Sequence, residues 1–153
     1  MDLFASRLWV AEDDHIYPSQ PNDYSLYRMS NDYLWFPGRI RMIKAVADGM
    51  YISDDTKTYY VQGNIPKEAV RRTVVESPAL EWSAIPDLIK PAEINMQGDD
   101  GWACWVSQEY GLVFGGPGGI IDIPTMGKMK MPKGLQQGVA VQDGRNFIYN
   151  LHQ

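Results

Sequence analysis

The sequence predicts an all-β protein built from antiparallel β-meanders. Short apolar runs alternate with turn signals along the chain, and no segment shows the sustained period of an amphipathic helix. The clearest stretch is 40–63, where apolar runs at 40–46, 50–53 and 58–62 are separated by Ala47-Asp48-Gly49 and Asp54-Asp55-Thr56-Lys57. Asp and Gly tolerate the backbone angles of tight hairpins, so we expect three antiparallel strands here.

This meander is expected to continue into a fourth strand. Residues 67–69 have the composition of one helical turn, and residues 70–76 follow as a further apolar, β-prone run. Four strands within roughly forty residues form either one blade of a β-propeller or one part of a β-sandwich. The sequence leaves both architectures open.

A second meander is expected at 101–125, with strands at 102–107, 112–114 and 120–123. Its last two strands align with those of the first meander at a constant offset of 62 residues, so that Gly49 matches Gly111. This match favours a repeated unit. The cluster Gly115–Gly119 is interpreted as a wide hairpin turn, because a phosphate-binding loop would be followed by a helix rather than by a strand-like run.

The two ends of the chain each predict a hairpin, at 7–17 and at 139–151. Between them, residues 18–37 are interpreted as an ordered loop, because Pro18, Pro21 and Pro37 disfavour a central strand. Residues 77–98 are interpreted as a connection with a short helix at 85–89. We expect a single domain over 1–153, with long Pro- and aromatic-rich loops and units at about 7–37, 40–76, 101–125 and 138–151.

Composition excludes several classes of protein. The net charge of -5 and the pI of about 4.9 give no electrostatic footprint for nucleic acid or an anionic membrane. No apolar run is long enough to span a membrane, and the N-terminus does not resemble a signal peptide. One cysteine and two histidines provide no metal-ligand spacing. We expect no cofactor, no metal and no small-molecule ligand.

No catalytic motif is found. The pairs Asp13-Asp14, Asp54-Asp55 and Asp99-Asp100 each lie at an expected turn, where Asp is favoured for backbone reasons. His15 follows an acidic pair but has no nucleophile in a recognisable setting. Cys104 lies between two tryptophans in an apolar run, which is typical of a buried structural thiol.

Two groups of side chains are candidates for contact with a partner. The first is aromatic and would either bind sugar, base or protein by stacking or cap an open sheet face; it comprises Tyr24, Tyr27, Tyr33, Trp35 and Phe36. The second alternates with lysines 128, 130 and 133 and forms either a flexible contact arm or a solvated loop; it comprises Met126, Met129 and Met131.

Taken together, several segments resemble bacteriophage virion proteins of the tail, neck and tail nozzle that contain propeller-like β-meanders. The resemblance lies in Arg7-Leu8-Trp9-Val10-Ala11, Ile16-Tyr17, Ser19-Gln20-Pro21 with Tyr24, Trp35-Phe36-Pro37, and in residues 48–53, 58–63 and 112–124. A closed propeller needs more blades than 153 residues supply, so the resemblance is to a truncated relative.

The resemblance implies a non-enzymatic structural protein of a tailed phage, located in the virion and assembled in the host cytoplasm. It implies a symmetric homo-oligomer that also contacts other virion proteins, with β-edges and the aromatic segment as contacts. Pairing of those edges would remove an aggregation hazard. A carbohydrate- or receptor-binding β-module is the alternative, and a small hydrolase that uses the acidic turns is the third hypothesis.

Overall fold

The computed structural model describes residues 1–143 and 146–153, and it confirms the all-β class. The described residues form 14 strands and three short 3-10 helices, η1 (Pro66–Glu68), η2 (Pro91–Ile94) and η3 (Pro117–Gly119). All strand pairings within the sheets are antiparallel. None of the described helices is long and apolar enough to cross a membrane.

The strands form four sheets that follow one another along the chain. Sheet I contains β1 (Asp2–Phe4), β2 (Arg7–Glu12), β3 (His15–Gln20), β4 (Asp23–Tyr27) and β5 (Leu34–Trp35). Sheet II contains β6 (Met42–Val46), β7 (Gly49–Ser53), β8 (Thr58–Gln62) and β9 (Val70–Val75). Sheet III contains β10 (Ala103–Ser107), β11 (Gly111–Gly115) and β12 (Ile121–Asp122), and sheet IV contains β13 (Gln137–Asp143) and β14 (Asn146–His152).

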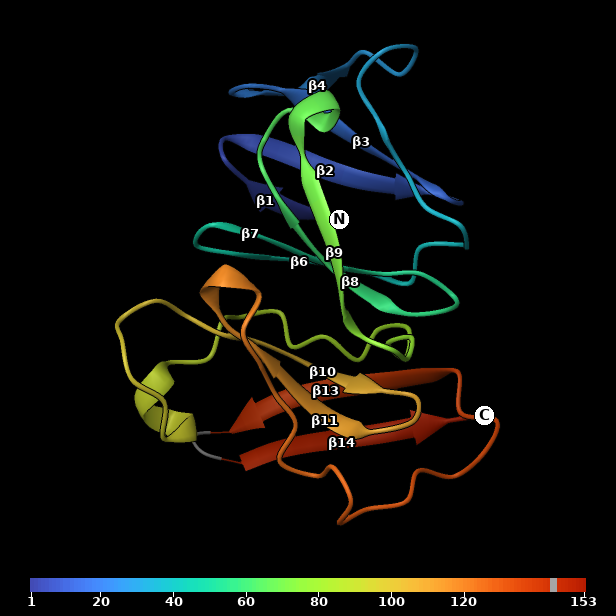
Figure 1. Cartoon of the computed structure of the whole chain (residues 1–153), viewed down its shortest axis with the longest axis vertical. Coiled ribbons are helices and arrows are strands. Elements are labelled where there is room, and N and C mark those ends of the chain that lie inside the picture. Colours follow the sequence, from blue (N-terminus) through green and yellow to red (C-terminus); the bar gives the residue numbers. More distant parts are fainter. Residues whose placement is uncertain (144–145) are drawn as a thin grey trace.

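Sheets I, II and III follow one another along the long axis of the molecule, and sheet IV packs against sheet III at the lower end, where the two sheets overlap in the view (Figure 1). A separate apolar cluster fills each gap between neighbouring sheets. One cluster joins sheets I and II around Trp9 and Ile52, a second joins sheets II and III around Tyr51 and Trp105, and further clusters join sheets III and IV around Phe114. Burial of apolar surface in these gaps is therefore the main stabilising contribution to the stack.

Strands β6, β7 and β8 of sheet II are largely buried on both faces, whereas β9 is mostly exposed. Side chains along a strand point alternately to opposite faces, and β7 accordingly places Met50 and Ile52 toward sheet I and Tyr51 toward sheet III. On β8, Tyr59 and Val61 face sheet I, and Tyr60 faces sheet III. Strands with apolar residues on both faces are typical of an inner layer, and this explains the strong strand signal at 40–63.

The meander predicted at 40–76 is confirmed, and its offset of 62 residues has a structural counterpart. Strand β7 begins at Gly49 and β11 begins at Gly111, and each strand has five residues. Sheets II and III then pack against each other: the ring of Tyr51 lies 5.1 Å from that of Trp105. The two similar units are therefore adjacent layers of one stack.

The loop predicted at 18–37 is wrong in part, because Pro18 lies within β3 and two further strands, β4 and β5, follow. On one side β3 pairs continuously with β2, and Pro18 stands opposite Trp9. On the other side its pairing with β5 involves His15 and Ile16, whereas its pairing with β4 begins at Ser19. Among the described residues, none in a strand stands opposite Pro18 on that side, so the missing N–H is tolerated.

The short helix predicted at 85–89 is also wrong. This segment is extended and runs alongside β10, with backbone N–H groups of Leu80 and Ile85 donating to the carbonyl oxygens of Val106 and Cys104, both at 2.9 Å. Ile89 and Trp102 exchange two backbone hydrogen bonds of 2.8 Å. The segment thereby continues sheet III, which the prolines in this region concealed in the sequence.

Lys44 is a buried cation that connects three layers. Lys44 is only 8% exposed, and its Nζ lies 3.6 Å from the Asp2 carboxylate of sheet I. It also donates a hydrogen bond to the carbonyl oxygen of Pro86, on the segment beside sheet III. Asp2 in turn accepts a 2.8 Å hydrogen bond from the backbone N–H of Ala45. These contacts fix the first strands of sheets I and II against sheet III.

Candidate functional site

The outer face of sheet I carries most of the predicted aromatic residues. Tyr24 and Tyr27 lie on β4, Tyr33 precedes β5, and Trp35 ends it. Tyr24, Tyr33 and Trp35 are each more than 40% exposed, and Tyr27 is half-buried. Four of the five predicted aromatic side chains therefore reach solvent at one end of the stack.

Phe36 is the exception, and its assignment to an exposed stacking surface is wrong. It is fully buried between sheets I and II, where its ring lies 5.2 Å from that of Tyr59. The guanidinium of Arg71 lies 5.0 Å from the centre of the Phe36 ring. Because this ring closes the gap between the sheets, it fits the capping alternative rather than the stacking one.

A shallow apolar groove crosses the same outer face of sheet I. It has a volume of about 540 Å³ and is lined mainly by Leu8 and Val10 of β2, Tyr17 of β3, and Tyr27 and Met29 at the end of β4. Leu8 and Val10 were not singled out in the sequence. The alternation of side chains along β2 could have identified them, because Trp9 points into the core and its two neighbours must therefore point outward.

An aromatic and acidic cluster borders this groove. The rings of His15 and Tyr33 are 5.1 Å apart, and that of Tyr17 is 6.3 Å from Tyr33. Asp14 contacts His15 Nδ1 at 2.5 Å and accepts a 2.9 Å hydrogen bond from Trp35 Nε1. The hydrogen bond with His15 lowers the pKa of Asp14. Exposed rings beside a carboxylate can stack on a flat ligand and accept hydrogen bonds from it.

The Met- and Lys-bearing loop lies at the opposite end of the stack and is only partly a contact arm. Met126 and Met129 are about half exposed, but Met131 is buried. Met131 packs with Leu80, Val106 and Leu135. The assignment of Met131 to an exposed contact surface is therefore wrong, because this side chain attaches the loop to the core.

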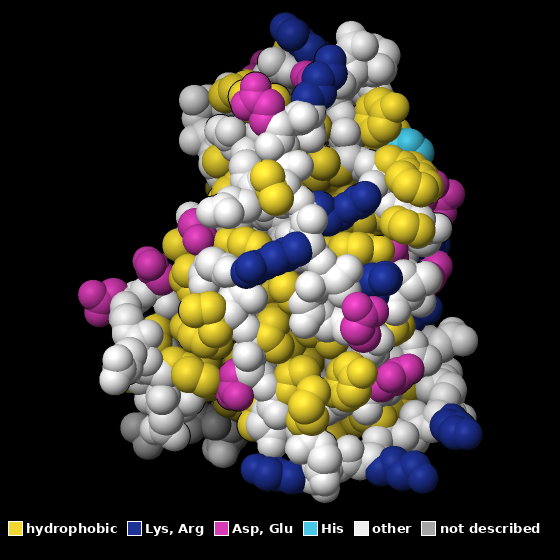
Figure 2. Space-filling view, viewed as in Figure 1, with side chains coloured by type: hydrophobic (Ala, Val, Ile, Leu, Met, Phe, Trp, Pro, Cys, Tyr) yellow, Lys and Arg dark blue, Asp and Glu magenta, His cyan; other side chains and the backbone are white. Residues whose placement is uncertain are grey.

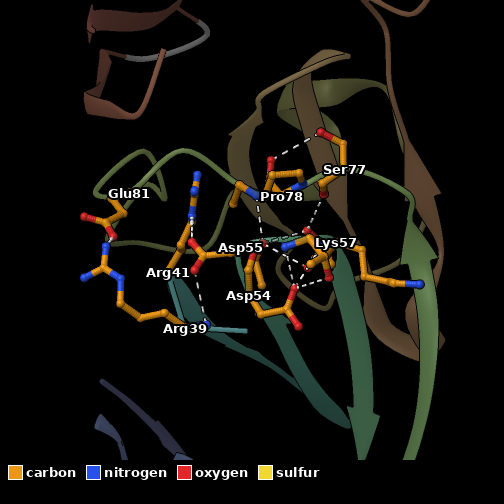
Figure 3. Close-up of polar contacts among 12 residues, drawn as sticks. Arg39, Arg41, Asp54, Asp55, Lys57, Ser77, Pro78 and Glu81 are labelled. Atoms are coloured by element: carbon orange, nitrogen blue, oxygen red, sulfur yellow. Dashed lines mark hydrogen bonds and ion pairs between the residues drawn. The ribbon is translucent and has the colours of Figure 1, made fainter. Parts of the chain in front are cut away.

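The Asp54-Asp55 pair forms a structural network rather than a free acid (Figure 3). Asp54 is fully buried, and its Oδ1 accepts hydrogen bonds from the backbone N–H groups of Thr56 and Lys57 at 2.7 and 3.0 Å. Its Oδ2 accepts a 3.0 Å hydrogen bond from the Tyr59 hydroxyl. Burial raises the pKa of Asp54, but these hydrogen bonds outweigh it and lower the pKa overall.

Asp55 is also engaged. Figure 3 shows its carboxylate facing Arg41, whose Nε lies 2.6 Å from Asp55 Oδ1, while Arg39 forms an ion pair with Glu81. Arg39, Arg41 and Glu81 line a second cleft, of about 310 Å³, together with the exposed Trp82. Because the two cations are matched by two carboxylates, this cleft has no excess charge for an ionic ligand. Of the acidic turns, the one at Asp54 offers no free carboxylate to a substrate, because Asp54 is fully buried and hydrogen-bonded.

The glycine cluster attaches sheet III to sheet II. The Tyr51 hydroxyl donates a 2.5 Å hydrogen bond to the carbonyl oxygen of Gly116. Asp48 accepts hydrogen bonds from the backbone N–H of Gly118 at 2.9 Å and from the Tyr60 hydroxyl at 2.6 Å. A Cβ atom at Gly115 would lie 2.6 Å from the Tyr51 ring. The interpretation as a turn is confirmed, and close ring packing is a further reason for glycine here.

Cys104 is buried, as the sequence predicts. Its Sγ lies 3.2 Å from the Tyr149 hydroxyl in the gap between sheets III and IV. Burial raises the pKa of the Cys104 thiol to about 12. Within residues 1–143 and 146–153, no three His, Cys, Asp or Glu side chains are grouped so as to hold a metal ion.

Comparison with protein-family models, with curated proteins and with solved structures finds no match for this chain. Its function must therefore be argued from its own residues.

Proposed function

We propose that the chain is a non-enzymatic structural component of a tailed bacteriophage particle. It acts in the tail or the head–tail neck, is assembled in the host cytoplasm, and contacts copies of itself and other virion proteins. The virion assignment rests on the resemblance of its meanders to phage tail, neck and nozzle proteins. The role in assembly rests on the outer face of sheet I.

One observation carries the assembly role, namely that the end sheet presents an apolar groove rimmed by exposed aromatic side chains. Exposed apolar surface is found at sites of protein association. Tyr, Trp and Met are also the residue types enriched at the centres of interfaces. The groove formed by Leu8, Val10, Tyr17, Tyr27 and Met29 has this composition.

The test is the composition of purified particles. Phage particles from a host that carries the gene are banded by density, and their peptides are measured by quantitative mass spectrometry. A fixed number of copies per particle is expected. The proposal is contradicted if the chain stays in the free-protein fraction, or if deletion of the gene leaves complete, infectious particles.

A carbohydrate- or receptor-binding module remains a second candidate, because of the cluster of Asp14, Tyr33 and Trp35. Half-exposed Trp35 is held by Asp14, so its ring is presented in a fixed orientation for stacking on a sugar. A glycan array with the native chain and with Trp35→Ala tests this function. Binding that is lost in Trp35→Ala but retained in the control Trp82→Ala, whose ring is exposed elsewhere, would support it.

A further inference from the structure

We infer that the chain associates head to tail with a second copy of itself, with the outer face of sheet IV docked on the outer face of sheet I. This inference rests on the proposed assembly role and specifies its partner and geometry. The contact would add the next layer to the stack, so that the two end sheets become inner layers like sheets II and III.

The outer face of sheet IV is the second unpaired apolar face of the stack. Strands β13 and β14 alternate between buried and exposed side chains, and Ala140, Phe147 and Tyr149 pack toward sheet III. Val139, Val141 and Ile148 point outward and are 62%, 55% and 56% exposed. Val141 stands directly opposite Ile148 across the two strands, and with Val139 they form a short apolar strip on a face whose other exposed residues, such as Asn146 and Asn150, are polar.

Both ends of the stack are therefore sheet faces that expose apolar side chains. Within the chain, faces of this type are covered by the neighbouring sheet in every gap. At the two ends of the stack these faces are open to solvent: the groove lies on sheet I and the strip lies on sheet IV. The two faces differ from each other, so a contact between them is heterologous and leaves one face free on each partner.

Charge complementarity favours this pairing over contacts between like ends. Residues 1–37, which contain sheet I, carry six acidic and two basic side chains. Residues 124–143, which lead into and form β13, carry three lysines and one aspartate. Figure 2 shows Lys and Arg side chains at both the lower and the upper end of the molecule, so the two ends differ in net charge and not in the presence of cations. An acidic end and a basic end attract each other, whereas two like ends repel.

Repetition of this contact produces either a ring or a fibre. A head-to-tail contact closes into a ring when the rotation between successive copies returns to the first copy, and otherwise it extends. Either product buries the groove and the strip on every copy except those at a free end. The association also covers the apolar side chains that the two end faces expose.

The test uses two variants that each disable one end. Val10→Glu places a carboxylate in the groove of sheet I, and Val141→Glu places one on the strip of sheet IV. Because both changes introduce the same charge, the two altered faces cannot pair with each other. Val70→Glu is the matched control, since Val70 is a strand residue that is 70% exposed on β9 and lines neither the groove of sheet I nor the strip of sheet IV.

Sedimentation velocity then distinguishes the possible contacts. We expect the native chain and Val70→Glu to show concentration-dependent association, and each end variant alone to stay monomeric. An equimolar mixture of Val10→Glu and Val141→Glu should form a 1:1 dimer and nothing larger, because one intact head meets one intact tail. If Val10→Glu fails to fold, Met29→Glu replaces it, because the Met29 side chain is half exposed at the rim of the groove.

Three results would overturn the inference. They are a native chain that is monomeric at every concentration, a mixture that stays monomeric, and association that is lost only in Val70→Glu. The first means that the end faces bind a different protein, and the last means that edge strands pair instead. The copy number in purified particles does not depend on this geometry, so the proposed function can stand when the head-to-tail contact fails.

Discussion

Replacement of Tyr51 by Phe tests whether the glycine cluster attaches sheet III to sheet II. The Tyr51 side chain is fully buried, and its hydroxyl donates to the carbonyl oxygen of Gly116 at 2.5 Å and lies 3.1 Å from that of Ile120. Ile120 keeps a 2.8 Å hydrogen bond from the backbone N–H of Gly116. The change therefore leaves mainly the Gly116 carbonyl without its partner, and it keeps the aromatic ring.

The expected loss follows from these contacts. A buried carbonyl without a partner costs about 1–3 kcal/mol, and we expect the free energy of unfolding to fall by about 2 kcal/mol. For a chain of this size that corresponds to a decrease in Tm of about 4–8 °C. Ring packing with Trp105 should be unchanged, because phenylalanine retains the ring.

Urea unfolding, followed by tryptophan fluorescence, measures this loss directly. Tyr24→Phe is the matched control, because the Tyr24 side chain is 46% exposed and its change should alter stability by less than about 0.5 kcal/mol. The reasoning is refuted if Tyr51→Phe is as stable as Tyr24→Phe. If both variants lose as much stability as is expected for Tyr51→Phe, the loss is not specific to the glycine cluster.

Three further predictions follow from buried polar groups. Asp54→Asn should lower the free energy of unfolding by about 2 kcal/mol at neutral pH, with no such loss in Asp99→Asn at an exposed turn. Because folding lowers the pKa of Asp54, the contribution of its carboxylate to stability is present above the unfolded pKa and is lost as pH falls through the folded pKa. The urea midpoint should therefore fall less between neutral and acidic pH in Asp54→Asn than in the native chain. Equal falls in the two proteins would contradict this. Cys104 should react with a thiol reagent only after unfolding, because burial raises its pKa to about 12; stoichiometric labelling of the native protein would show that this thiol is accessible. Lys44→Ala should destabilise the protein by about 3 kcal/mol, because it leaves the Asp2 carboxylate unpaired, whereas Lys57→Ala, whose partner Glu76 is exposed, should have less than about 1 kcal/mol of effect.

The strands of the inner layers could be predicted from the sequence, because β7 and β8 carry apolar residues on both faces and the turns of sheet II contain Asp and Gly. The same patterns located β2, β10, β11 and the C-terminal hairpin. The offset between Gly49 and Gly111 indicated a repeat, but only the structure places these units as neighbouring layers.

The remaining errors have physical causes in the tertiary structure. Pro18 was expected to break β3, but in the described part of the chain no strand partner stands opposite it on one side. Phe36 and Met131 belong to segments rich in exposed residues, yet each is buried by a neighbouring layer that is distant in sequence. The groove on sheet I is formed by strands β2, β3 and β4 together, and one-dimensional spacing does not reveal which outward residues become neighbours.

The most direct test of the central claim is chemical cross-linking between the two ends of different copies. Val10→Cys and Val141→Cys chains are prepared separately, each with one accessible thiol because Cys104 is buried, and are mixed with a short bis-maleimide linker. Head-to-tail docking predicts that the mixture yields mainly cross-linked dimers that contain one chain of each variant. Dimers of a single variant, or a yield no higher than that of a Val70→Cys control, would contradict it.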